Sequence, residues 1–310
     1  MRLDGLHHIT MITGDAQRNV DFYADLLGLR LVKTTVNFDA PEAYHLYFGD
    51  ETGSAGSILT WFEFAGAARG RPGTGMIHTI QLGVPAPAAI EFWAARLSGA
   101  GVSCERGEGT LRFTDYDGLA LELVVAVTGN PPLVAAHPEI PSEHALIGPQ
   151  GARAYGRAPA GAAPLLTRTM GFEAQGEGTY RVTGEHRRFA WAYDEPPAEP
   201  GRQGAGTVHH IAWACPDAEQ LDWQERLREA RAMVTDVRDR DYFTSIYFRE
   251  PRGILFEIAT LSPGFAVDED PDHLGEALKL PRMHEHLRPQ LERTLTPLVN
   301  PRARRRAVQA

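Results

Sequence analysis

The chain has 310 residues, of which 43% are hydrophobic and 23% are charged, a composition typical of globular proteins. Its formal net charge of -9 argues against a nucleic-acid-binding protein, which would need a basic surface. The two cysteines, Cys104 and Cys215, lie in no metal-ligand spacing, and no stretch has the length of a signal peptide or a membrane span. We therefore expect a cytoplasmic protein that binds neither nucleic acid nor membrane.

The first 66 residues predict one compact supersecondary unit. An apolar strand at residues 5–12 is followed by a helix that starts at Asp15 and ends at Gly28, with Val20 and Tyr23 on one apolar face. Three strand candidates follow at residues 30–36, 43–48 and 57–64. The pattern is β-α-β-β-β.

The same pattern recurs along the chain. Further copies are expected at residues 75–128, 143–195 and 206–262, followed by a C-terminal extension at residues 263–310 whose basic run, Arg302 with Arg304–Arg306, should be solvated. In the third copy, Pro159, Gly161 and Pro164 argue against a long helix. Because one such unit cannot bury both of its faces, the α+β fold should pair the four units into curved sheets that enclose cavities.

Two histidine doublets are the most informative feature. His7-His8 lies in the first strand of the first copy, and His209-His210 lies in the first strand of the fourth. Because side chains alternate along a strand, only one member of each doublet should face a shared cavity. The clear copies align on the second histidine, with His78 as the counterpart in the second copy.

A carboxylate completes a candidate metal site. Glu257 lies in the last strand of the fourth copy among apolar neighbours, where a buried carboxylate is costly unless it is paired or binds a cation. His8, His210 and Glu257 together are the ligand set of an open non-haem metal site. If they share one metal, the first copy must pair with the fourth, and the second with the third. His78 and Glu122, in contrast, are expected to be ordinary hydrogen-bonded residues.

Several motifs resemble the vicinal oxygen chelate superfamily, which includes glyoxalase I, bleomycin- and fosfomycin-resistance proteins and extradiol dioxygenases. Within it the chain is most similar to ring-cleaving dioxygenases that open hydroquinones, over residues 3 to about 280. The motifs that carry this resemblance are Leu6-His7-His8-Ile9-Thr10, Thr13-Gly14-Asp15-Ala16-Gln17, Tyr44-His45-Leu46-Tyr47-Phe48-Gly49-Asp50, Val208-His209-His210, Arg240-Asp241-Tyr242-Phe243, Ser245-Ile246-Tyr247 and Phe256-Glu257.

The resemblance implies two half-barrel sheets and assigns roles to individual residues. It implies that His8, His210 and Glu257 bind Fe(II), and the donor set itself also suits Mn(II) or Zn(II). Arg240 and Tyr247 match positions near the substrate. The first histidines and Thr10 match positions beside the metal ligands, so the expected catalytic residues are Tyr247, Arg240 and His209.

These expectations define a function and its alternatives. We expect an Fe(II)-dependent, O₂-consuming dioxygenase that cleaves hydroquinone-type or catechol-type rings, acting as a homo-oligomer on a small aromatic substrate. A glyoxalase-like lyase or isomerase with Zn or Ni is the first alternative, and Glu63 is available as its fourth ligand. The second is a sequestering protein of the bleomycin-resistance kind, which would lack a complete ligand triad.

Overall fold

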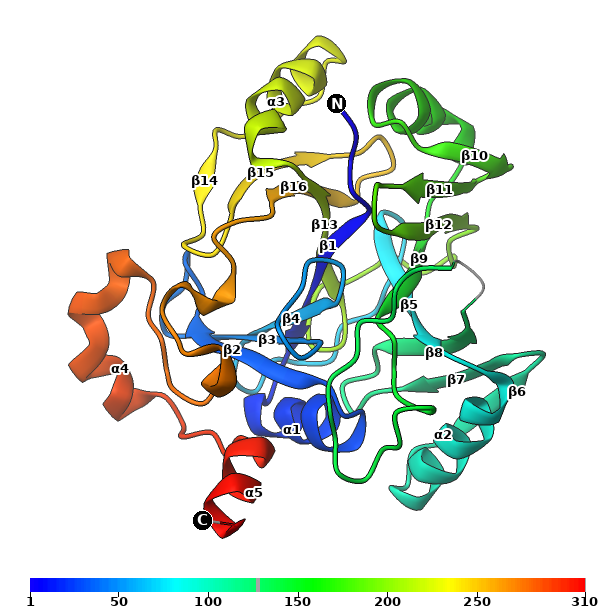
Figure 1. The fold of residues 1–310 in the computed structure, drawn as a ribbon. Helices are drawn as coiled ribbons and strands as arrows, with labels where there is room; N and C mark the ends of the chain where they lie inside the picture. The colour runs from blue at the N-terminus through cyan, green and yellow to red at the C-terminus, as the bar shows by residue number, and fades with distance from the viewer. Residues whose placement is uncertain (127–128, 310) are drawn as a thin grey trace.

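The computed structural model describes residues 1–126 and 129–309 and contains two eight-stranded curved sheets (Figure 1). The first sheet has the strand order β14-β15-β16-β13-β1-β4-β3-β2. Its strands are β1 (Leu6–Thr13), β2 (Arg30–Val36), β3 (Tyr44–Gly49), β4 (Ile58–Glu63), β13 (Val208–Cys215), β14 (Arg238–Asp239), β15 (Thr244–Arg249) and β16 (Leu255–Thr260).

The second sheet repeats this arrangement with the central part of the chain. Its order is β10-β11-β12-β9-β5-β8-β7-β6. Its strands are β5 (Met76–Val84), β6 (Cys104–Gly107), β7 (Thr110–Thr114), β8 (Ala120–Val125), β9 (Pro149–Tyr155), β10 (Glu173–Gly176), β11 (Thr179–Thr183) and β12 (Arg188–Asp194).

Two four-stranded units meet at the centre of each sheet. β1 pairs antiparallel with β13, and β5 pairs antiparallel with β9. Each central strand also pairs in parallel with the last strand of its own unit, namely β4, β16, β8 or β12. The predicted fold class is confirmed, including the pairing of the first unit with the fourth and of the second with the third.

The helices cover the outer surfaces of the sheets (Figure 1). They are α1 (Ala16–Val20), which continues as a π-helix (Asp21–Leu26), α2 (Pro87–Gly99) and α3 (Gln220–Glu229). The Asp15 carboxylate caps α1 by accepting the Arg18 backbone N–H at 3.0 Å, and Gly28 ends the segment with a φ of +73°. The third unit has only short helical turns (Pro159–Gly161 and Pro164–Thr169), as its prolines predict.

The C-terminal extension follows the outer edge of the first sheet. Its elements are short turns (Phe265–Val267, Pro271–His273 and Arg282–Leu287), α4 (Arg288–Thr294) and α5 (Pro301–Gln309). A bridge between Thr34 and Leu278 covers the edge strand β2. The expectation of a solvated basic run holds for the exposed Arg304 and is wrong for the other three arginines, because acidic groups of the first unit and of the extension face α5. The resulting ion pairs are Arg302–Glu51, Arg305–Asp25 and Arg306–Glu276.

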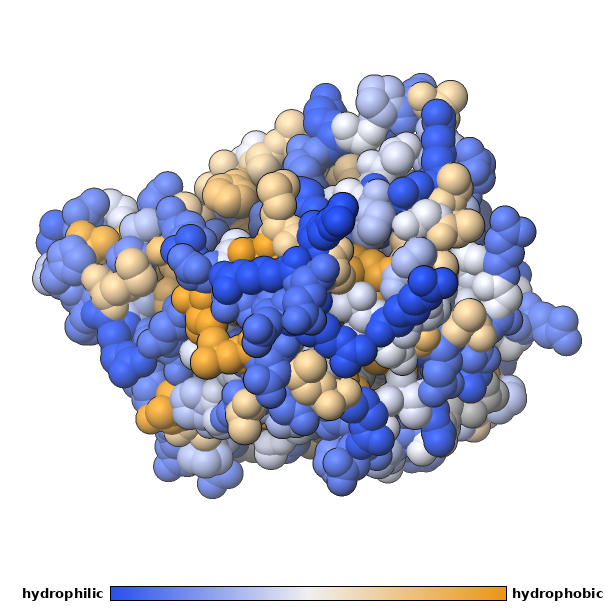
Figure 2. Space-filling view, turned by 90° about the horizontal axis from the view of Figure 1, so that it is seen from above, coloured by the Kyte–Doolittle hydropathy of each residue, from blue (hydrophilic) through white to orange (hydrophobic). Residues whose placement is uncertain are grey.

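The apolar core has two parts. A large cluster packs both sheets together with the helices, and a smaller one lies within the first sheet and the extension. Tyr47 and Phe243 belong to the smaller cluster and also line the pocket described below. The face in Figure 2 is mainly hydrophilic, with apolar side chains in small groups. Among the helices of the described residues, none has both the length and the apolar character needed to cross a bilayer.

Candidate metal centre

Each histidine doublet lies at a β-bulge between β1 and β13. The register shifts by one residue at His7 and again at His209, so each of these is an extra residue on its strand. The bulges bring Nδ1 of His7 to 2.8 Å from Nδ1 of His8, and Nδ1 of His209 to 2.7 Å from Nδ1 of His210. The expectation that the members of a doublet point apart is therefore wrong, because a bulge breaks the alternation of side chains.

The second histidines converge with Glu257 beneath the pocket. Nε2 of His8 lies 3.2 Å from Nε2 of His210. Oε2 of Glu257 lies 3.3 Å from the first of these nitrogens and 3.0 Å from the second. All three residues are buried, and among the described residues they form the one group of at least three potential ligands close enough to hold a metal ion. The structure thus brings together the three residues that the sequence analysis selected.

The tautomer of His8 follows from its hydrogen-bond partners. Burial, followed by the neighbouring His8, lowers the pKa of His7 to about 3, so His7 is neutral and carries one ring proton. Nε2 of His7 lies 3.0 Å from the Thr260 carbonyl, which can only accept, so the proton is on Nε2. Nδ1 of His7 must then accept from Nδ1–H of His8. A neutral His8 then has its lone pair on Nε2, the atom that lies beside Glu257 and His210.

His210 has the same kind of partner, but that partner faces the pocket. His209 lines the pocket, and burial, followed by His210, lowers its pKa to about 4. When Nδ1 of His209 accepts from Nδ1–H of His210, Nε2 of His210 presents a second lone pair to the cluster. Both imidazoles can thus act as neutral metal ligands whose other nitrogen is hydrogen-bonded.

Glu257 supplies the anionic member of the cluster. Oε1 accepts a hydrogen bond from the Ser245 hydroxyl, whereas Oε2 is buried without a hydrogen-bond donor among the described residues. Burial would raise the pKa of Glu257, but positive charge on His8 and His210 holds that pKa well below its usual range, so the carboxylate is ionised. A metal ion bound to the three residues would take the place of that positive charge. Two imidazole nitrogens and an orphaned carboxylate oxygen fit a divalent metal such as Fe(II), Mn(II) or Zn(II).

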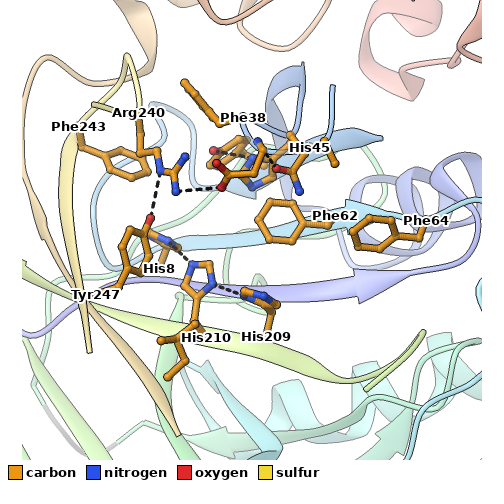
Figure 3. Close-up of a pocket in the computed structure, with 15 residues that line it drawn as sticks. His8, Phe38, His45, Phe62, Phe64, His209, His210, Arg240, Phe243 and Tyr247 are labelled. Carbon is orange, nitrogen blue, oxygen red and sulfur yellow. Dashed lines mark hydrogen bonds and ion pairs between the residues drawn. The ribbon is translucent and has the colours of Figure 1, made fainter. Parts of the chain in front are cut away.

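A cavity of about 390 Å³ opens above this cluster (Figure 3). Aromatic side chains form much of its wall, and they are Phe38, Phe62, Phe64 and Phe243. His8 and His210 lie at one side of it, with His209 beside them. A mainly apolar pocket with a few convergent polar groups is suited to a small aromatic molecule.

Arg240 and Tyr247 lie together at the pocket wall. Nε of Arg240 donates to the Tyr247 hydroxyl at 3.2 Å, and its Nη2 reaches Asp39 at 3.3 Å. Burial, followed by the Glu257 charge, raises the pKa of Tyr247 well above its usual range, so the phenol keeps its proton. Because its oxygen accepts from Arg240, its O–H remains available to donate into the pocket.

The second sheet carries the same two bulges without the same residues. The extra residues there are His78 and Gln150, which makes His78 the counterpart of His7. The alignment of His78 with the metal-cluster histidines is therefore wrong by one residue, and the position that matches His8 holds Thr79.

Ion pairs and hydrogen bonds occupy the polar groups of this second sheet. Nε2 of His78 contacts Asp194 at 2.9 Å. Glu122 accepts from Arg112 and from Gln81, at 2.6 Å in each case. These contacts agree with the expectation that His78 and Glu122 are ordinary hydrogen-bonded residues.

The structure also places residues that the sequence analysis gave no role or a different one. Glu63, the proposed fourth ligand, accepts the Ala16 backbone N–H at 3.1 Å at the start of α1 and does not belong to the cluster. His45 and Tyr47, in contrast, line the pocket. Their alternate spacing on β3 was the signal that could have placed them on one face.

Comparisons with known proteins agree with this geometry. The model of the Glyoxalase/Bleomycin resistance protein/Dioxygenase superfamily matches residues 5–123 and 158–258. The chain is 45% identical to MhqO of Bacillus subtilis (strain 168), which carries the assignment of ring-cleaving dioxygenase, over 94% of this chain and 96% of MhqO. It is 32% identical to the chlorohydroquinone/hydroquinone 1,2-dioxygenase of Sphingobium indicum, over 95% of this chain and 96% of that protein.

Solved structures show the same fold. A Bacillus subtilis protein assigned as a dioxygenase superposes with a TM-score of 0.89 at 42% identity, covering 96% of this chain and 98% of that one. Glyoxalase I from Zea mays superposes with a TM-score of 0.59 at 11% identity, covering 83% of this chain and 92% of that one. The second likeness concerns the fold alone.

Proposed function

The chain belongs to the glyoxalase/bleomycin resistance protein/dioxygenase superfamily, and we propose that it is an Fe(II)-dependent, O₂-consuming dioxygenase that cleaves the ring of hydroquinone-type or catechol-type diols. The observation that supports this most directly is the buried convergence of His8, His210 and Glu257 under an aromatic-walled pocket. MhqO is named a ring-cleaving dioxygenase and the Sphingobium indicum relative a chlorohydroquinone/hydroquinone 1,2-dioxygenase, and both names support the same reaction class.

The proposed ligands are Nε2 of His8, Nε2 of His210 and Oε2 of Glu257. Three protein ligands leave coordination positions open for exogenous molecules. Fe(II), when bound, would supply Lewis acidity and a path for electrons from the diol to O₂. Mn(II) or Zn(II) suits the same donor set, so the metal content of the protein is part of the test.

The remaining groups of the pocket bind the ring and manage protons. The phenylalanine walls hold the ring and exclude water. The O–H of Tyr247 donates to a substrate oxygen, and the Arg240 guanidinium stabilises negative charge that develops there. His209, with Nδ1 engaged by His210, carries its proton on Nε2 and can donate a hydrogen bond from it to an oxygen in the pocket.

Oxygen consumption tests the proposal. The protein is loaded with Fe(II) without air, then given hydroquinone or catechol with air, while an oxygen electrode and the loss of ring absorbance are followed. We expect stoichiometric uptake of O₂ and a ring-opened product, with no uptake by Zn(II)-loaded protein. Absence of uptake with every substituted hydroquinone and catechol would rule out the dioxygenase.

The metal analysis also separates the alternatives. A redox-inactive metal with a fourth protein ligand would favour a glyoxalase-like isomerase. Glu63 does not support this alternative, because its carboxylate accepts the Ala16 backbone N–H. Tight ligand binding without metal would favour a sequestering protein. The homo-oligomer stays a prediction, to be checked by measuring the mass in solution.

A further inference from the structure

The internal repeat of the first sheet relates two groups of pocket residues. Glu257 pairs with the residue three positions after the bulge at His209, and Thr60 pairs with the residue three positions after the bulge at His7. Thr60 is therefore the counterpart of Glu257 in the first unit. The repeat thus relates His8 to His210 and Thr60 to Glu257. Of these four positions, the one at Thr60 carries a hydroxyl instead of a carboxylate.

The neighbouring strands extend this correspondence. Tyr247 is the β15 partner of Glu257, and Tyr47 is the β3 partner of Thr60. Two residues earlier on these strands stand Ser245, which donates to Glu257, and His45, which contacts Thr60. Two tyrosines thus line one pocket from equivalent positions, and the proposed function uses only Tyr247.

Tyr47 belongs to a buried hydrogen-bonded chain. Its hydroxyl lies 2.9 Å from Nδ1 of His45, and Nε2 of His45 contacts Oγ1 of Thr60. The His45 and Tyr47 rings lie 4.0 Å apart between centroids, which fixes their orientation. Burial lowers the pKa of His45 well below its usual range, so the imidazole is neutral with one ring proton.

A neutral imidazole in this chain can take either tautomer. With the proton on Nε2, His45 donates to Thr60 and accepts from Tyr47, so the Tyr47 oxygen offers lone pairs to the pocket. With the proton on Nδ1, Thr60 donates to His45 and His45 donates to Tyr47, so the Tyr47 O–H points to the pocket. Tyr47 can therefore meet either a donor or an acceptor.

Strand spacing sets the position of this group. β3 is separated from β1 by β4, so the Tyr47 backbone lies two strand spacings, about 9.6 Å, from the strand that carries His8. The Phe62 ring bridges the gap, with its centroid 4.4 Å from that of His45 and 6.3 Å from that of His210. A ring lying against Phe62 would have one end at the metal cluster and the other toward Tyr47.

We propose that Tyr47, positioned by His45 and Thr60, binds the ring oxygen remote from the metal and thereby selects para-diols over ortho-diols. This rests on the proposed function. The two oxygens of a catechol are adjacent and reach the metal together, whereas those of a hydroquinone stand at opposite ends of the ring. Only the second kind of substrate presents a hydroxyl to Tyr47.

Equilibrium binding tests this selection independently of turnover. Affinities of hydroquinone, catechol and phenol are measured without air for the Zn(II)-loaded and Fe(II)-loaded protein. Tyr47→Phe should weaken hydroquinone binding on the order of tenfold and leave phenol and catechol unchanged, because one hydrogen bond is lost. Thr60→Val should cause a smaller loss of the same kind, and Thr60→Ser should restore it.

Tyr44→Phe is the matched control. Tyr44 lies on the same strand, but its hydroxyl donates to the Thr296 carbonyl, so its removal should not change the preference for hydroquinone. Equal weakening of all three compounds by Tyr47→Phe, or no change, overturns the inference even if the wild type consumes O₂. Tyr47-dependent selection without O₂ consumption upholds the inference and refutes the dioxygenase, and binding of no compound overturns both.

Discussion

Replacement of His7 tests how the metal ligands are prepared. Two contacts of His7 fix the tautomer of His8: Nε2 donates to the Thr260 carbonyl at 3.0 Å, and Nδ1 accepts from His8 at 2.8 Å. In His7→Phe both contacts are lost. His8 can then carry its proton on Nε2, the atom proposed to bind the metal. The variant should bind Fe(II) or Zn(II) more weakly although no metal ligand has changed.

The size of the effect follows from the contact that is lost. Loss of a partner to a metal-binding histidine typically lowers metal affinity about 10- to 100-fold, or about 1.4–2.7 kcal/mol. His7→Asn is the matched variant, because its Oδ1 can take the place of Nδ1 and accept from His8. Both variants leave the Thr260 carbonyl without the His7 donor, so their difference isolates the tautomer of His8. The expected order of affinity is wild type, then His7→Asn, then His7→Phe.

Competition with a chromophoric chelator measures these affinities without air. Thermal unfolding of the metal-free variants provides the control, since both should lose a similar amount of stability. If His7→Phe binds metal as tightly as the wild type, or if the two variants are equal, the partner of His8 does not set its proton position. The hydrogen bond between His7 and His8 would then not be what keeps Nε2 of His8 free to bind the metal.

Three further predictions concern Glu257, Tyr247 and Asp115. Glu257→Gln places an amide donor where a carboxylate oxygen has no donor, so metal-induced stabilisation should vanish while the metal-free protein melts higher than the metal-free wild type. Tyr247→Phe removes the acceptor of Arg240 and the O–H offered to substrate, and should lower kcat about 10²-fold with little change in the metal affinity. Burial raises the pKa of Asp115, which accepts from Tyr23, from 3.8 to about 6, so its stabilisation is complete below pH 3.8 and is lost as the pH rises through 6. Asp115→Asn should remove about 3 kcal/mol of this pH dependence from chemical denaturation curves.

The sequence was sufficient to predict the cluster because of the internal repeat. His8 and His210 stand at matching places in two copies, and Glu257 is a carboxylate in an otherwise apolar strand. Requiring them to share a metal also predicted that the first unit pairs with the fourth, which β1 and β13 confirm. Both predictions used only the spacing of the repeat and the position of charged residues, which can be read directly from the sequence.

The contacts of the first histidines could not be predicted in the same way. Alternation placed His7 and His209 on the opposite face, but each is the extra residue of a bulge, and a bulge depends on the partner strand. The same omission shifted the alignment of His78 by one residue. Glu63 was selected as a ligand for its charge, whereas register places the uncharged Thr60 at the corresponding position.

The two sheets have the same backbone arrangement, so their side chains decide which of them can bind a metal ion. Both have the same strand order and the same pair of bulges, so both present a carboxylate at the same level, Glu257 in one and Glu122 in the other. Arg112 neutralises Glu122, and no metal is needed there. Around Glu257 the nearest described groups are the His8 and His210 imidazoles and the Ser245 hydroxyl, none of which is a permanent cation like arginine, so the site can accept a metal ion. The metal centre therefore depends on the absence of an arginine as much as on the presence of two histidines, and an arginine introduced beside Glu257 should abolish metal binding without altering the sheet.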